Sequence, residues 1–68
     1  MTIVLNGKAV ELADEASVTE AVDAAGVDRE PRGIAVAVDG EVVPRGEWES
    51  TRLREGQAVE VVQAVQGG

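Results

Sequence analysis

Two dipeptides, Asn6-Gly7 and Asp39-Gly40, limit the folds open to this chain more than any other feature of its sequence. Each stands between two runs of apolar residues, and an Asn-Gly or Asp-Gly pair in that setting is a strong local signal for a β-hairpin with a type I′ turn. We therefore predict two hairpins, one at each dipeptide. Their strands are expected at about residues 2–6, 8–12, 34–38 and 41–43.

The segment between the hairpins predicts one helix at about residues 18–25. Ser17 and Glu20 have the spacing of a capping box, a pair of residues that satisfies free N–H groups at a helix N-terminus. Gly26 suits the left-handed residue that commonly follows a helix. Apolar residues recur with helical spacing at Val18, Ala21, Val22 and Ala25. The small side chains of this stripe allow the helix to lie close to a sheet.

Residues 58–64 predict a final strand that is apolar on both faces. Val59 and Val61 lie on one face, and Val62 and Ala64 lie on the other. Such a strand belongs in the middle of a sheet, and pairing beside the first strand would make the sheet mixed. The predicted fold class is therefore α+β, a β-grasp (ubiquitin-like) architecture. We expect a mixed sheet of four to five strands with one main helix packed on one face, in the order β-β-α-β-β-β.

The composition argues against most kinds of catalytic site. The chain has 68 residues, with no His, Cys, Tyr or Phe and a single Trp. It lacks the usual nucleophiles, transition-metal ligands and general bases, so we expect a protein that is not an enzyme and binds no cofactor or metal. A net charge of −7 disfavours nucleic acid and anionic membranes as partners. Without cysteines or a long apolar run, the free protein is expected to be a cytoplasmic monomer.

The chain ends on Gly67-Gly68, and this end is the candidate reactive group. We predict a folded domain over residues 1–64 and a flexible tail over residues 65–68. Glycines lack Cβ atoms, so an extended Gly-Gly end can pass through a channel that is too narrow for other residues. The alternative is a frayed terminus at which glycine is merely tolerated.

The terminal carboxyl of Gly68 needs a partner to become reactive. A terminal carboxyl ordinarily has a pKa of about 3.5 and is ionised at neutral pH. A carboxylate is a poor electrophile, so it must first be activated, most simply as an acyl-adenylate made from ATP. The glycines at 7, 26, 33, 40 and 46 stand singly, without the spacing of a phosphate-binding loop. ATP must therefore be bound by a partner enzyme, and this chain is interpreted as a carrier.

Three segments carry a family resemblance: Ile3-Val4-Leu5-Asn6-Gly7, Val42-Val43-Pro44-Arg45-Gly46-Glu47-Trp48 and Ala64-Val65-Gln66-Gly67-Gly68. Together they resemble the ThiS family, the sulfur carrier proteins of thiamin thiazole biosynthesis. The resemblance spans essentially the whole chain, and the pattern V-P-R-x-x-W at residues 43–48 is its most discriminating part. The Gly-Gly end is shared with the small subunit of molybdopterin synthase (MoaD-type) and with ubiquitin.

The resemblance implies a function and a set of partners. A ThiF-like, E1-related adenylyltransferase would use ATP to adenylate the Gly68 carboxyl, and a sulfurtransferase bearing a persulfide would supply sulfur to give a thiocarboxylate. Thiazole synthase (ThiG) would then accept the sulfur. The residues that thread into the partners' active sites would be Val65, Gln66, Gly67 and Gly68. Two alternatives stay open: a MoaD-type carrier for molybdopterin synthase, and a ubiquitin-like modifier or non-reactive interaction module.

Apolar residues of the last strand also predict a partner surface, because exposed apolar patches often mark such surfaces. The residues proposed for it are Val59, Val61, Val62, Ala64 and Arg45. Shielding by neighbouring strands is the alternative for the apolar residues, and an ion pair with Glu41 or Glu47 is the alternative for Arg45. Trp48 is expected to anchor the polar loop 45–56. The acidic residues of the helix and its flanking loops, at 14, 15, 20, 23, 28 and 30, are expected to form a solvated surface.

Overall fold

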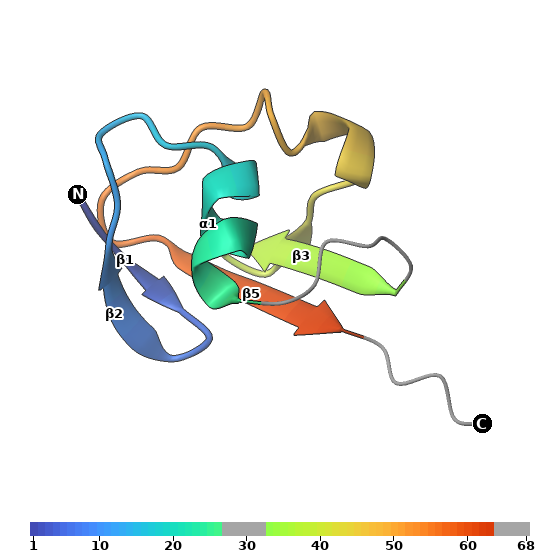
Figure 1. Cartoon of the computed structure of the whole chain (residues 1–68), viewed down its shortest axis with the longest axis horizontal. Helices are drawn as coiled ribbons and strands as arrows, with labels where there is room; N and C mark the ends of the chain where they lie inside the picture. The colour runs from blue at the N-terminus through green and yellow to red at the C-terminus, as the bar shows by residue number, and fades with distance from the viewer. Residues whose placement is uncertain (27–32, 64–68) are drawn as a thin grey trace.

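The computed structural model describes residues 1–26 and 33–63. Within these residues the fold is one five-stranded sheet with one α-helix lying across one of its faces (Figure 1). The strands are β1 (Thr2–Leu5), β2 (Lys8–Glu11), β3 (Ile34–Val38), β4 (Glu41–Val42) and β5 (Ala58–Gln63), the α-helix is α1 (Val18–Ala25), and a 3-10 helix, η1, spans Arg45–Glu47. This arrangement confirms the predicted α+β, β-grasp class and the order β-β-α-β-β-β.

Both predicted hairpins form at their Asx-Gly turns. Asn6 and Asp39 each have a φ of 50°, and the glycines that follow them, Gly7 and Gly40, have φ values of 83° and 86°. Two successive residues with positive φ are what a type I′ turn requires. The second strand of the second hairpin, β4, is one residue shorter than the predicted 41–43, because Pro44 cannot donate to a ladder.

The helix begins and ends at the predicted residues. Ser17 is the N-cap in an extended conformation, and its backbone N–H points at the Glu20 carboxylate, 3.5 Å away. Gly26 has a φ of 75°, and its N–H donates to the Asp23 carbonyl at 3.1 Å. This left-handed residue satisfies one of the carbonyls left free at the helix C-terminus. The buried side of α1 carries Val18, Ala21 and Val22.

The last strand is the centre of the sheet. The strand order is β2-β1-β5-β3-β4, with β5 parallel to β1 and antiparallel to β3. The sheet is therefore mixed, as predicted. The five strands and α1 enclose a core whose largest fully buried side chains are Ile3, Val18, Val22, Val36 and Val59.

The segment between β4 and β5 is anchored to the core, as predicted for Trp48. The Trp48 side chain is 5% exposed, and its indole N–H donates to the Val43 carbonyl at 2.9 Å. Leu53 is also buried, and its backbone N–H donates to the Ala16 carbonyl at 2.8 Å. These contacts tie the segment to β4 and to the residues just before α1, so it packs against the domain despite its polar composition.

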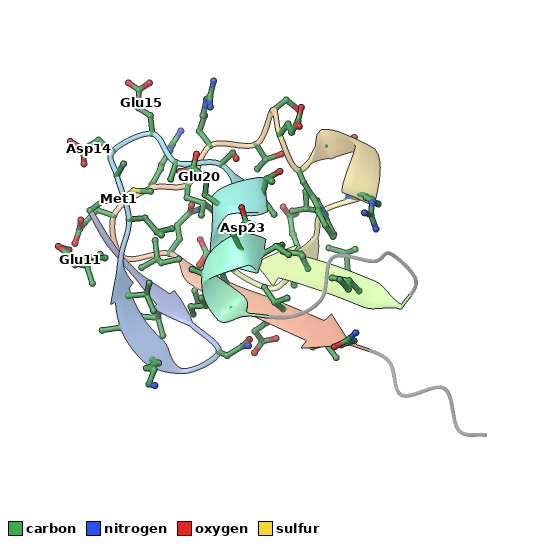
Figure 2. All side chains as sticks on the ribbon, in the orientation of Figure 1. Met1, Glu11, Asp14, Glu15, Glu20 and Asp23 are labelled. Atoms are coloured by element: carbon green, nitrogen blue, oxygen red, sulfur yellow. The ribbon has the colours of Figure 1, made fainter. Side chains whose placement is uncertain are left out.

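Of the acidic residues predicted to form a solvated surface, those at 14, 15, 20 and 23 are exposed, and those at 28 and 30 lie outside the described residues. Figure 2 shows Glu11, Asp14 and Glu15 directed away from the body of the molecule. The Met1 ammonium lies 3.3 Å from the Asp14 carboxylate and donates to the Leu12 carbonyl at 2.7 Å. Among residues 1–26 and 33–63, no three acidic side chains come close enough to hold a metal ion. No helix in these ranges has the length and apolar character needed to span a bilayer.

Trp48 provides a test of how the domain is stabilised. We expect Trp48→Ala to lower the free energy of unfolding by about 3–5 kcal/mol, because it removes a large buried side chain. Trp48→Phe should cost about 1–3 kcal/mol, since it keeps most of the packing but leaves the Val43 carbonyl without its donor. Urea unfolding followed by circular dichroism measures both. A Trp48→Phe variant as stable as wild type would contradict a contribution of the hydrogen bond, and equal losses in the two variants would contradict the contribution of packing. The exposed Glu49→Ala serves as the control, expected within about 0.5 kcal/mol of wild type.

Candidate functional site

The residues proposed to thread into partners lie outside the described part of the chain. These are Val65, Gln66, Gly67 and Gly68, together with Ala64. The boundary between a domain over 1–64 and a tail over 65–68 therefore stays a prediction. What the structure does describe is the strand that leads to this end, β5, and the two faces of the sheet on either side of it.

The structure corrects the predicted partner surface at two positions. Val59 and Val61 were assigned to that surface, but they are 0% and 5% exposed and belong to the core beneath α1. Side chains alternate across a strand, so Val62 points to the opposite face and is 57% exposed. The sequence shows that β5 is apolar on both faces, but not which face the helix covers. Of the valines proposed on this strand, Val62 alone is available to a partner.

The face of the sheet away from α1, called the outer face below, is mostly apolar. The strand registers pair Val4 with Ala58, Ala37 with Glu60 and with Val42, and Ala35 with Val62. The residues of the outer face are Thr2, Val4, Ala9, Glu11, Ala35, Ala37, Val42, Ala58, Glu60 and Val62.

The exposed large hydrophobic residues of the described chain all lie on the outer face. They are Val4, Val42 and Val62, which are 39%, 74% and 57% exposed. Two exposed carboxylates share this face, Glu60 on the central strand and Glu11 at the edge on β2. Small apolar side chains with a carboxylate among them suit a protein partner that brings apolar side chains and a cation. Val4 and Val42 were not among the residues predicted for a partner surface, although Val4 alternates in the sequence with Ile3 and Leu5, which are both buried.

Arg45 lies elsewhere. It belongs to η1, and its guanidinium carbon is 5.1 Å from the centre of the Trp48 ring, within the range of a cation–π contact. A shallow pocket is lined by Thr19, Gly46 and Glu49 as well as by Arg45 and Trp48. Since Thr19 is on α1, Arg45 sits on the helix side of the sheet. The structure thus separates Arg45 from Val62, with which the sequence analysis grouped it.

Two polar side chains, which the sequence analysis treated only as turn formers, contact β5. The Asn6 amide bonds to the backbone of Val61, and the Asp39 carboxylate bonds to the backbone N–H of Ala58. Because the contacting residues lie far apart in the chain, these contacts leave no local pattern in the sequence. They fix the position of β5 relative to both hairpins.

Comparison with known proteins identifies a family and similar solved structures. The model of the ThiS family matches residues 3–68. The crystal structure of the thiamine biosynthesis protein (ThiS) from Geobacter metallireducens has 31% sequence identity and a TM-score of 0.78, with all of both chains covered. The solution structure of a thiamine biosynthesis protein from the same organism has 33% identity and a TM-score of 0.78, covering all of this chain and 88% of the other. A search of curated proteins found no match.

The two faces of β5 can be distinguished by paired substitutions at neighbouring positions. Val61→Thr places a hydroxyl in the core and should lower the free energy of unfolding by about 1–3 kcal/mol. Val62→Thr makes the same change on the outer face and should stay within about 0.5 kcal/mol of wild type. Urea unfolding followed by Trp48 fluorescence gives both values. A larger loss for Val62→Thr than for Val61→Thr would reverse the assignment of the faces.

Proposed function

Since this chain belongs to the ThiS family, a family of small sulfur carrier proteins, we propose that its terminal carboxyl, at Gly68, is the group that receives and delivers sulfur. The observation that carries this proposal is the extent of the family match, which runs to Gly68 and so includes the Gly-Gly end. The similar structures bear the name of thiamine biosynthesis. We therefore propose that the sulfur goes to the thiazole of thiamin through thiazole synthase (ThiG).

The proposed chemistry exchanges one oxygen of the carboxylate for sulfur. In a ThiF-like adenylyltransferase, a Gly68 oxygen attacks the α-phosphorus of ATP, and pyrophosphate leaves. The terminal sulfur of a persulfide on a sulfurtransferase then attacks the acyl carbon, and AMP leaves with the oxygen. A thiol cleaves the acyl disulfide that results, and the carrier keeps the sulfur as a thiocarboxylate. The described residues include no His or Cys, and no side chain of the carrier has to act in these steps.

The folded domain provides a binding element next to this terminus. β5 lies at the centre of the sheet and ends at Gln63, so the terminus follows a strand that pairs with neighbours on both of its edges. Four residues beyond the domain, 65–68, reach about 13 Å when extended. Ordering them in an enzyme costs on the order of 4–8 kcal/mol of backbone entropy. Binding of the folded domain to the same enzyme has to offset this cost.

We propose that the folded domain binds the adenylyltransferase through its outer face. β5 contributes Ala58, Glu60 and Val62 to this face and then leads directly to the terminus. A partner that covers the outer face is therefore also close to the C-terminal end of β5. The apolar residues provide the buried area, and Glu60 calls for an arginine or lysine on the enzyme, which fixes the orientation of the domain.

The first test is conversion of the purified protein by ATP, a ThiF-like adenylyltransferase and a persulfide donor. Intact mass spectrometry should show a gain equal to sulfur minus oxygen, because one carboxylate oxygen is replaced. A variant that lacks Gly68 is the control and should stay unchanged. An unchanged mass of the full chain, or equal conversion of the shortened one, would rule out the proposed reaction.

The second test concerns the outer face. Val62→Asp should weaken binding to the adenylyltransferase by about tenfold or more, because it replaces an exposed apolar side chain of this face with a second carboxylate beside Glu60. Titration calorimetry measures the Kd, and urea unfolding verifies that the variant is folded. Ala13→Asp introduces the same charge in the exposed loop before α1 and should leave Kd within about twofold. Equal Kd values for the two variants would remove the outer face from the interface.

A further inference from the structure

One side chain from each hairpin turn forms hydrogen bonds with β5. In the half of β5 that leads to the C-terminus, the Asn6 carbonyl oxygen accepts from the Val61 N–H at 2.8 Å, and the Asn6 amide nitrogen donates to the Val61 carbonyl at 3.2 Å. At the start of β5, the Asp39 carboxylate accepts from the Ala58 N–H at 3.0 Å and from the Gln57 side-chain amide at 3.1 Å. Each turn residue therefore makes two side-chain hydrogen bonds to β5 or to the residue just before it.

The chemical type of each side chain matches the groups it meets. Asn6 faces one N–H and one carbonyl of the same residue, and of Asn and ionised Asp only the carboxamide of Asn provides both an acceptor and a donor. Asp39 faces two N–H groups, which a carboxylate accepts without offering a donor of its own. The requirement for positive φ in a type I′ turn is met by either residue. The choice between Asn and Asp at these turns thus follows from the strand that each one contacts.

The direction of each neighbouring strand decides which end of β5 its turn reaches. β3 is antiparallel to β5, so Asp39 comes to the start of β5. β1 is parallel to β5, so Asn6 comes to the half of β5 that leads to the C-terminus. Backbone pairing with β1 stops at Leu5↔Val59, and the Asn6 side chain continues it to Val61. Among the described residues, these are the last hydrogen bonds on the β1 side of β5 before residue 64.

We propose that Asn6 is a positioning residue for the reactive terminus: its amide fixes the place at which the chain leaves the domain. The proposal rests on the sulfur carrier function above. With Asn6, the strand is held on both sides up to Val61, and Val62 and Gln63 are held by β3. Without Asn6, Val61 is also held from the β3 side alone, and the enzyme must order it together with the terminus. Removing Asn6 should therefore weaken productive docking of the carrier on the enzyme and leave the chemical step unchanged once the terminus is bound.

Two glycine variants separate this role from a general effect on stability. Glycine readily adopts positive φ, so Asn6→Gly and Asp39→Gly both keep their turns, and each loses two side-chain hydrogen bonds to β5 or its flank. Amide hydrogen exchange gives the first readout. The Val61 amide should lose its protection in Asn6→Gly and keep it in Asp39→Gly, while the backbone amide of residue 6, which donates to the Val59 carbonyl at 2.9 Å, should stay protected in both. Full protection of Val61 in Asn6→Gly would overturn the proposal.

Kinetics of adenylation by a ThiF-like enzyme give the second readout. Asn6→Gly should raise the KM for the carrier about tenfold, since ordering one additional residue costs about that much in affinity, and should keep kcat within twofold. Asp39→Gly should keep both constants within twofold. Equal KM values in the two variants, or a loss confined to kcat, would overturn the positioning role. If Trp48 fluorescence shows that Asn6→Gly is unfolded, Asn6→Asp is tested in its place. Asn6→Asp keeps the acceptor but loses the donor, and a wild-type KM for this variant would again overturn the positioning role.

The outcomes also separate this proposal from the function on which it rests. If the wild-type chain is not adenylated at all, the carrier function fails, and the positioning role fails with it. If the wild-type chain is adenylated and Asn6→Gly has the wild-type KM, the carrier function stands and the positioning role alone is overturned.

Discussion

The pairing of β5 on both of its edges is the constraint on which the rest of this structure depends. A central strand closes the sheet between two hairpins that are far apart in the chain, and it satisfies its backbone on both sides with β1 and β3. Because β1 is parallel to it and β3 antiparallel, the two hairpin turns arrive at opposite ends of the same strand. The helix then has one continuous surface to cover, which completes a core that a chain of this length could not otherwise fill.

The two faces of β5 serve different purposes. Val59 and Val61 contribute to the core and stabilise the domain, whereas Val62 lies with other small apolar residues on a face that the domain itself leaves open. Leaving apolar side chains in water gives up part of the stabilisation that their burial would bring, about 25 cal/mol for each Å². Under the proposed function, that free energy is recovered when a partner covers the face, and the gain offsets the entropy lost on ordering the terminus.

Under the proposed function the partner enzymes carry out the reaction, and this explains why the chain itself has few reactive side chains. The reactive group is the end of the backbone, and the enzymes provide ATP, the sulfur donor and the acceptor under the proposed function. What the folded part has to provide is a fixed starting point for the terminus and a surface for recognition. The buried Trp48 and the bridge between Arg52 and Ser17 tie the segment that precedes β5 to the domain, and the side chains of Asn6 and Asp39 bond to β5 itself.

The sequence alone determined what depends on neighbouring residues. The two Asx-Gly turns, the cap at Ser17, the end at Gly26 and the Gly-Gly terminus are all local patterns, and each turn or cap formed where it was predicted. The tertiary structure decided which face of β5 is buried, because a strand apolar on both sides has no periodicity that marks one of them. It also brought Asn6 to Val61, 55 positions away, and gathered Val4 and Val42 with Val62 on the outer face. These arrangements depend on strand order and register, which are set by contacts between distant segments that no local pattern encodes.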